Sequence, residues 1–264
     1  MSLPKTGPSY DLAVAMLLPA LRILTRREWS GTEHIPREGG VIVAANHLSY
    51  FDPLALAHFL HAQGRAVRFL AKEALFDAPV FGHLLRSAGQ IPVRRGSRHA
   101  GNALAAAEDA VRRGECVVIY PEGTITRDPA LWPMAGKTGL VRVALATGCA
   151  IVPVAQWGAQ EVLAPYARVP RLLPRKTMRI SAGPAIDLTA YRGAEPTPAL
   201  LKSIASSVMH AITDLLAMLR SADPPSVPFD PRTRNLPSTG NFRRRARERL
   251  RRVRATERPG PGAP

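Results

Sequence analysis

The sequence predicts an α/β fold in which one central, mostly parallel or mixed sheet is flanked by helices. Short apolar segments alternate with longer segments of helical period along the chain, which is the pattern of α/β architecture. Three of the apolar segments, Val41–Ala45, Cys116–Tyr120 and Ile151–Ala155, lack polar alternation, as is typical of strands that are buried on both faces. The length of 264 residues and the 46% hydrophobic content suffice for one sizeable core.

The individual elements follow from local signals. A helix is expected over residues 9–28, and a turn-rich approach with Gly39 and Gly40 then leads into the strand at 41–45. Residues 199–219 carry apolar residues at helical spacing on one face. The other expected elements are helices over 53–63, 72–88 (broken at Pro79), 98–113 (with Ser97 as N-cap) and 137–147, and strands at 67–71, 90–93 and 176–182.

The chain divides into three parts, which are an N-terminal helix (1–28), a main domain (29–220) and a Pro- and Arg-rich tail (221–264). The apolar run Leu12–Leu24 is shorter than the roughly 20 residues that span a bilayer, so the first helix is expected either to lie in a membrane interface or to pack on the body. Eight arginines fall within 243–254, beside apolar residues at helical spacing. Binding to an anionic membrane and a disordered, solubilising tail are both consistent with this pattern.

The charge balance predicts anionic partners. The formal net charge is +16, and residues 221–264 contribute 11 Arg against 4 acidic residues. Nucleic acid, acidic lipid surfaces and phosphorylated substrates all fit such a charge. The two cysteines, Cys116 and Cys149, lie in apolar segments, so we expect buried thiols and no disulfide framework. No histidine or cysteine spacing is typical of a metal site, and no secretory signal is apparent.

The most informative segment is Asn46–Asp52, which directly follows the strand at 41–45. His47 and Asp52 are five residues apart, so they fall on different faces of a helix and on opposite faces of a strand. They meet only if the chain leaves the strand at His47 and turns into a helix, with Asp52 as N-cap and Pro53 in the first position. A histidine that is held by a carboxylate is a ready general base. The alternative is that Asp52 only caps the helix and His47 only ends the strand.

Three further blocks carry residues of the same kind of chemistry. Gly89–Arg95 delivers the guanidinium groups of Arg94 and Arg95 at the end of a short strand, where they suit a phosphate. Tyr120–Thr124 follows a buried strand, and its Gly123 permits close backbone approach to a ligand. Val152–Val154 forms a third apolar strand.

The four blocks, in this order and at these spacings, resemble the glycerophospholipid acyltransferase family, whose members carry N-H-x-S-x-x-D, G-x-I-x-V-x-R, F-P-E-G-T-R-S-like and V-P-V blocks. The resemblance covers about residues 28–160. It implies an O-acyltransferase that moves a fatty acyl group from acyl-CoA or acyl carrier protein to a lysophospholipid. The expected reaction converts 1-acyl-sn-glycerol 3-phosphate to phosphatidic acid in phospholipid biosynthesis. It requires no cofactor beyond the thioester cosubstrate.

The resemblance also implies roles for individual residues. His47 acts as the general base for the acceptor hydroxyl and Asp52 orients the imidazole, so no covalent enzyme intermediate is needed. Ser49 is the alternative nucleophile, but no G-x-S-x-G elbow surrounds it. The residues assigned to substrate binding are Asn46, Ser49, Arg95, Glu122, Gly123, Thr124 and Lys137. The expected location is the cytoplasmic face of the cell membrane, as a peripheral or monotopic protein.

Two departures from the family pattern keep alternatives open. Tyr120 stands where the family usually has Phe, and Ile125 stands where it has an Arg that contacts the acceptor phosphate. Arg127 is a substitute for that contact, or else the acceptor is glycerol 3-phosphate, a lyso-aminolipid or a glycolipid. A basic nucleic-acid-binding protein is a distant alternative, which explains the charge but none of the four blocks.

Overall fold

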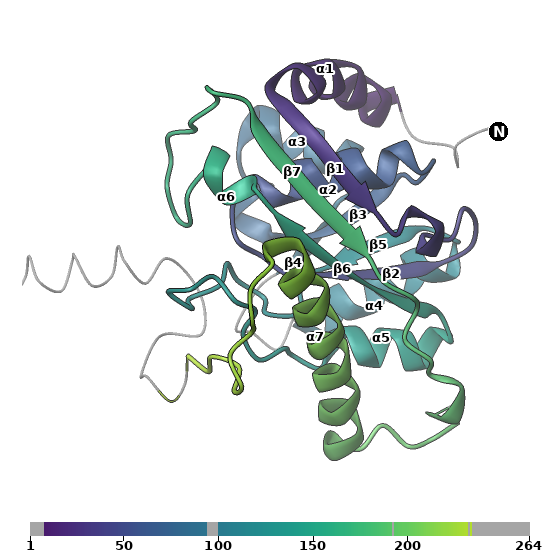
Figure 1. Ribbon diagram of the computed structural model, residues 1–264. Helices are drawn as coiled ribbons and strands as arrows, with labels where there is room; N and C mark the ends of the chain where they lie inside the picture. Colours follow the sequence, from purple (N-terminus) through teal and green to yellow (C-terminus); the bar gives the residue numbers. More distant parts are fainter. Residues whose placement is uncertain (1–7, 94–99, 192, 232, 234–264) are drawn as a thin grey trace, which may run out of the picture.

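Seven strands form one mixed sheet in the order β1-β7-β6-β2-β5-β3-β4, as predicted for the fold class (Figure 1). The computed structural model describes residues 8–93, 100–191, 193–231 and 233. The strands are β1 (Thr25–Ser30), β2 (Val41–Ala45), β3 (Val67–Lys72), β4 (Ile91–Val93), β5 (Cys116–Ile119), β6 (Ala150–Trp157) and β7 (Lys176–Ala182).

Neighbouring strands run parallel throughout, except that β6 and β7 are antiparallel. In the centre of the sheet, Val41 of β2 lies opposite Cys116 of β5 and Ala150 of β6. The carboxyl ends of these three strands therefore meet at one edge of the sheet. In open α/β sheets this edge is where ligands bind.

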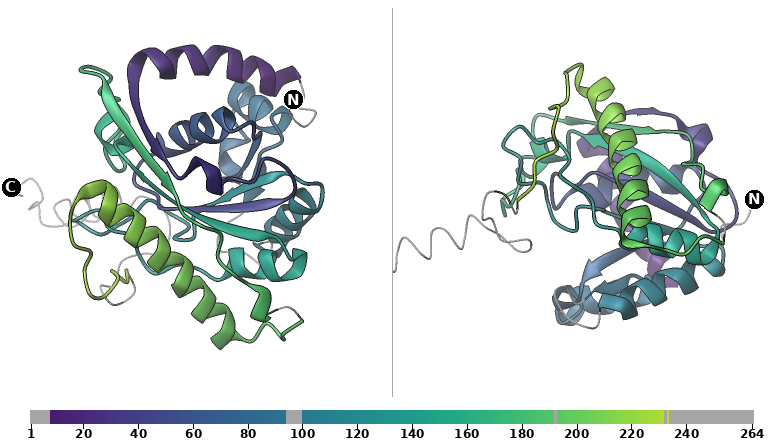
Figure 2. Two further views of the ribbon diagram at one scale, coloured as in Figure 1. Left: turned by 45° about the vertical axis from the view of Figure 1, so that its right-hand side comes forward. Right: turned by 90° about the horizontal axis from the view of Figure 1, so that it is seen from below.

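Helices cover both faces of the sheet (Figure 2). The first layer holds α1, α2 and α3, and the second holds α4, α5 and α7. The helices are α1 (Pro8–Leu24), α2 (Asp52–Ala62), α3 (Pro79–Ser87), α4 (Ala100–Arg112), α5 (Gly139–Thr147), α6 (Ala159–Val162) and α7 (Pro198–Arg220), with short 3-10 turns η1 (Thr32–His34), η2 (Glu73–Leu75) and η3 (Thr189–Tyr191).

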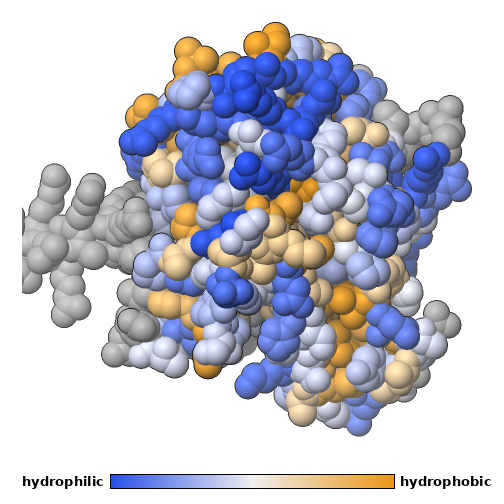
Figure 3. Space-filling view, in the orientation of Figure 1, coloured by the Kyte–Doolittle hydropathy of each residue, from blue (hydrophilic) through white to orange (hydrophobic). Residues whose placement is uncertain are grey.

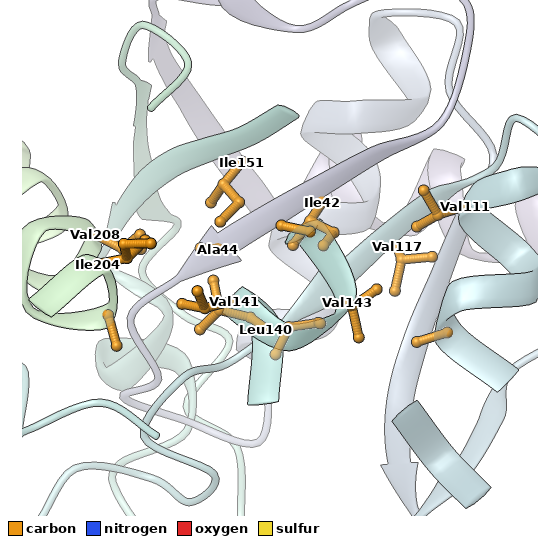
Figure 4. Close-up of a cluster of buried hydrophobic side chains, with 14 of the residues drawn as sticks. Ile42, Ala44, Val111, Val117, Leu140, Val141, Val143, Ile151, Ile204 and Val208 are labelled. Atoms are coloured by element: carbon orange, nitrogen blue, oxygen red, sulfur yellow. The ribbon is translucent and has the colours of Figure 1, made fainter. Parts of the chain in front are cut away.

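The core has two halves because successive side chains of a strand point to opposite faces. From β2, Ile42 and Ala44 pack against α4, α5 and α7, where Figure 4 shows them among Leu140, Val141 and other apolar side chains. Val41 and Val43 of the same strand face the other way and pack against α2. All five residues of β2 are fully buried, which explains the continuous apolar run in the sequence.

The first helix has a buried face and an exposed apolar face. Tyr10 and Leu21 are buried, and Tyr10 and Val14 pack near the end of α3. At 100° per residue, the opposite face carries six exposed apolar residues, with the exposed Arg22 beside them: Leu12, Ala15, Met16, Pro19, Ala20 and Ile23. Within the described residues, one helix (α7) is long and apolar enough to cross a membrane, but its apolar face packs on the sheet.

Several predicted boundaries need correction. The N-terminal helix ends at Leu24 rather than 28, because residues 25–30 pair with β7 as the edge strand β1. Helix α2 begins at Asp52 and its N-cap is Phe51, so Asp52 is not the cap. The predicted helix over 72–88 is a 3-10 turn followed by α3. The predicted N-cap Ser97 lies outside the described residues.

One residue within the predicted tail contacts the body of the protein. Ala135 N–H donates to the carbonyl oxygen of Phe229 at 3.4 Å, and Phe229 forms an isolated bridge with Met134. Phe229 therefore contacts the loop that carries Met134, whereas residues 221–228 are exposed. The Arg-rich segment 243–254 lies outside the described residues.

Candidate functional site

The turn between β2 and α2 brings His47 and Asp52 together, as the sequence predicts. His47 Nδ1 lies 2.8 Å from Asp52 Oδ2. The same carboxylate oxygen accepts hydrogen bonds from the backbone N–H groups of Leu48 and Ser49, the latter at 2.8 Å. Asp52 thus holds the turn that precedes its helix, and three donors converge on a single oxygen. The turn and the histidine are fixed by one carboxylate.

The His47 imidazole is held on one side and accessible on the other. The Asp52 side chain is fully buried, whereas that of His47 is 12% exposed. Because Nδ1 is engaged by Asp52, Nε2 is the nitrogen that remains for a substrate hydroxyl. The ring stacks on Tyr120 with centroids 4.2 Å apart and planes at 17°, and Tyr120 in turn lies parallel to Phe69. This stack restricts the rotation of the imidazole.

Glu122 braces the same histidine from the end of β5. Its Oε1 accepts from the backbone N–H of His47, and its Oε2 accepts from the backbone N–H of Met134, both at 3.0 Å. Glu122 is buried, and this burial raises the pKa of its carboxyl to about 8, against the lowering effect of the two N–H donors. Both carboxyl oxygens therefore accept hydrogen bonds from backbone N–H groups of the protein.

Asn46 connects the site to β6 through hydrogen bonds with Gln156. Asn46 Nδ2 donates to the carbonyl oxygen of Gln156 at 3.0 Å, and its Oδ1 accepts from Gln156 N–H at 2.8 Å. Gln156 Nε2 donates to the carbonyl oxygen of Asn46 at 2.8 Å. Gln156 was not predicted from the sequence, although a lone amide within an apolar strand is a signal for such a pairing.

Gly123 and Lys137 are brought together at the turn after β5. Gly123 has φ of +69°, and a Cβ atom placed on it would lie 2.7 Å from Lys137 Nζ. Lys137 N–H donates to the carbonyl oxygen of Pro121 at 2.9 Å, which fixes the start of the lysine side chain. The turn thus needs a glycine both for its backbone conformation and for the ammonium group that crosses it. Thr124 is buried beside this turn.

Ser49 fastens the loop that follows α6. Its hydroxyl donates to the carbonyl oxygen of Leu163 at 2.6 Å and accepts from Phe51 N–H at 3.0 Å. Ile125, the residue at the family's arginine position, is 2% exposed, and its carbonyl oxygen accepts from Tyr166 OH at 2.8 Å. Arg127 is buried as well. The predicted phosphate ligand Arg95 and its neighbour Arg94 lie outside the described residues.

The loop that carries Met134 is held by a contact with the carboxyl end of α7. The guanidinium carbon of Arg220 lies 4.0 Å from the ring centroid of Trp132 and 4.4 Å from that of Trp157. A cation between two indole faces stabilises such an arrangement when it is partly desolvated. Thr126 Oγ1 also donates to the carbonyl oxygen of Trp132 at 2.7 Å. These contacts hold the loop that orients Glu122.

The assembled site joins an accessible imidazole to a buried carboxylate at the carboxyl ends of three strands, with an ammonium group nearby. Such an arrangement is suited to taking a proton from a hydroxyl and stabilising the resulting imidazolium. Among the residues that the structure describes, no cluster of three His, Cys, Asp or Glu side chains is placed to hold a metal ion.

Comparison with known proteins identifies relatives of this chain. The model of the acyltransferase family matches residues 26–157. A 1-acyl-sn-glycerol-3-phosphate acyltransferase of Borreliella burgdorferi is 32% identical over 146 residues, which are 54% of this chain and 54% of the relative. An uncharacterized protein of Mycobacterium tuberculosis is 34% identical over 165 residues, 56% of this chain and 43% of the relative. The chain thus spans about half the length of these relatives.

A solved structure shares the fold. The crystal structure of the 1-acyl-sn-glycerophosphate acyltransferase from Thermotoga maritima aligns with a TM-score of 0.63 at 21% sequence identity. The alignment covers 82% of this chain and 81% of that one.

Proposed function

This chain belongs to the acyltransferase family, and we propose that it transfers a fatty acyl group from an acyl thioester to the hydroxyl of a lysophospholipid. The observation that carries the proposal is the 2.8 Å contact between His47 Nδ1 and Asp52 Oδ2, which leaves Nε2 to the acceptor. The acceptor proposed first is 1-acyl-sn-glycerol 3-phosphate, since the Borreliella burgdorferi relative is named for that substrate.

The proposed reaction needs no covalent enzyme intermediate. His47 Nε2 takes the proton of the acceptor hydroxyl as its oxygen attacks the thioester carbonyl carbon. The C–O ester bond forms, the C–S bond breaks, and the imidazolium returns the proton to the departing thiolate. Asp52 stabilises the imidazolium while it exists, which is the logic of a Ser-His-Asp triad in which the substrate hydroxyl replaces the serine. General base catalysis of this kind contributes roughly 10²–10⁴-fold.

The remaining residues are proposed to position these two. Glu122 fixes the backbone of His47, and Asn46 joins β2 to β6 below it. Ser49 acts as a fastener of the turn rather than as a nucleophile, since its hydroxyl is engaged with Leu163. Lys137 is proposed to meet the acceptor phosphate above Gly123, together with Arg95.

A second candidate acceptor is favoured by Ile125. This side chain is 2% exposed and apolar where the family carries an arginine, so one phosphate contact of the family is replaced. A lyso-aminolipid or a glycolipid, which presents no glycerol phosphate, would be less affected by that replacement, and glycerol 3-phosphate is a further alternative acceptor.

The proposed location is the cytoplasmic surface of a membrane, where the lipid acceptor is found. The exposed face of α1 is mostly apolar, with Leu12, Met16 and Ile23 at 57%, 57% and 68% exposure. A helix of this kind lies in the interface plane with its apolar face among the acyl chains. The formal charge of +16 favours an anionic leaflet.

The test is acyl transfer by the purified protein. Oleoyl-CoA is supplied with 1-acyl-sn-glycerol 3-phosphate, glycerol 3-phosphate, a lyso-aminolipid or a glycolipid in separate reactions, and acylated products are identified by mass spectrometry. We expect diacyl product and free CoA in equal amounts. His47→Ala should reduce turnover by at least 10²-fold. His210→Ala, at an exposed histidine of α7, is the matched control. Wild-type turnover in His47→Ala contradicts the mechanism.

A further inference from the structure

The loop between α6 and β7 exposes an unusual stretch at residues 168–175. Its sequence is Arg-Val-Pro-Arg-Leu-Leu-Pro-Arg, with three arginines and no acidic residue. Val169 is 77% exposed, Leu172 is 36% exposed and Leu173 is 79% exposed. Isolated exposed aliphatic side chains are ordinary on a soluble protein, but three of them interleaved with three arginines in eight residues are not.

One end of this stretch is fixed to the first helix. Arg175 donates to the carbonyl oxygens of Arg22 at 2.9 Å and Thr25 at 2.8 Å, where α1 ends and β1 begins. The end of the loop at Arg175 therefore lies beside the carboxyl end of α1 (Figure 1). Figure 3 shows apolar side chains along this upper rim of the molecule, beside a band of hydrophilic ones.

The other end of the loop is fixed to the candidate active site. The carbonyl oxygen of Leu163 accepts from the Ser49 hydroxyl, and Tyr166 OH donates to the carbonyl oxygen of Ile125. The Tyr166 ring also meets the Tyr50 ring edge to face at 6.4 Å. The loop is thus a bridge of about a dozen residues from the block that carries His47 to the apolar face of α1.

We infer that residues 168–175 form a second membrane-docking element, which lies with the exposed face of α1 on one anionic lipid surface. The aliphatic side chains suit the acyl region of a leaflet, and the arginines suit its phosphates. A second copy of this chain is disfavoured as the occupant because each copy carries a net charge of +16. The chain's own segment 243–254 has eight arginines and is repelled for the same reason.

This docking has a consequence for the proposed reaction. A lysolipid reaches the His47 imidazole only by leaving the leaflet. The loop runs directly from the proposed membrane surface to the block that carries His47. A surface hollow of about 330 Å³ lies within the loop, lined by Ala164, Ala167, Arg168, Val169 and Arg171. The inference rests on the proposed function only for the identity of the acceptor, since the surface itself is defined by exposure and charge.

Vesicle binding tests the inference without any catalytic readout. The full-length protein is mixed with sedimenting vesicles of phosphatidylcholine alone or with 30% phosphatidylglycerol. Full burial of one leucine side chain corresponds to roughly a tenfold change in partitioning, and one arginine at an anionic surface to roughly fivefold. We expect Leu172→Ser/Leu173→Ser to bind anionic vesicles at least tenfold more weakly than the wild type. Arg168→Gln/Arg171→Gln should weaken binding to anionic vesicles only.

Two controls make each outcome decisive. Val227→Ser, at an apolar side chain that is 75% exposed elsewhere on the surface, should bind as the wild type does. His47→Ala should also bind normally, so failure of the proposed chemistry and failure of the docking are seen separately. Unchanged vesicle binding of the double serine variant overturns the inference. So does a loop-dependent self-association in gel filtration without lipid, which would assign the surface to protein contacts.

Discussion

Replacing Asp52 with Asn separates the charge of the carboxylate from its geometry. The asparagine carbonyl oxygen can take the place of Oδ2 and accept from His47 Nδ1 and from the N–H groups of Leu48 and Ser49. Its NH₂ group then takes the place of Oδ1. The hydrogen bonds of the turn are kept, so we expect the free energy of unfolding to change by only about 1 kcal/mol.

The lost charge determines the catalytic effect. With Nδ1 and Oδ2 at 2.8 Å, the charge centres of an imidazolium and the carboxylate lie about 4 Å apart. At an effective dielectric constant of about 20, their attraction is roughly 4 kcal/mol. Because about 1.4 kcal/mol corresponds to tenfold in rate, the turnover of Asp52→Asn should fall by up to about 10³-fold.

The assay follows release of free thiol from oleoyl-CoA in the presence of the acceptor, and urea unfolding is measured on the same samples. Asp109→Asn, at an exposed carboxylate of α4, is the control for the chemical change itself. Turnover of Asp52→Asn within tenfold of the wild type, with stability retained, would refute a stabilising role of the Asp52 charge. Loss of several kcal/mol of stability would instead refute the argument that the turn tolerates the amide.

Two further predictions concern pH and the tail. Burial raises the pKa of Glu122 from 4.5 to about 8, so between these pH values the folded state keeps a proton that the unfolded state loses. The free energy of unfolding should therefore fall as pH rises from 4.5 to 8, by up to about 5 kcal/mol (3.5 pH units at 1.36 kcal/mol each). Urea unfolding at pH 5 and pH 8 should show a larger loss for the wild type than for Glu122→Gln, and equal losses would contradict this origin. Deleting residues 241–264 should weaken binding to anionic vesicles at low salt more than at high salt. Identical binding to neutral and anionic vesicles before and after deletion would rule out that role of the tail.

The interior strands were predictable from the sequence because strands that are buried on both faces consist of continuous apolar residues. Strands β2 and β7 begin and end where the apolar pattern predicted, and the strand–turn–helix geometry around His47 follows from one five-residue offset. Strand β1 was missed because Arg26, Arg27 and Glu28 are exposed on it, so no alternation marks it. It forms only because the distant strand β7 offers an open edge.

The supporting contacts of the candidate site were less predictable because they join distant segments. Gln156 meets Asn46 across 110 residues, and Glu122 meets Met134 only where the loop returns over the end of β5. Sequence resemblance places Glu122 among the substrate-binding residues, and the structure adds that its two oxygens accept from the backbone amides of His47 and Met134. The motif thus marks the right position without stating which partner the carboxylate serves.

The junction between α1 and β1 has a mechanical consequence. No residue intervenes between Leu24 and Thr25, and the Thr25 hydroxyl donates to the carbonyl oxygen of Leu21 at 2.6 Å across the joint. No flexible linker therefore separates the helix from the sheet, and the two move as one rigid body. If α1 rests in a bilayer, the catalytic body keeps a constant tilt above it. Acceptors then arrive from a single direction, and products return to the leaflet from which they came.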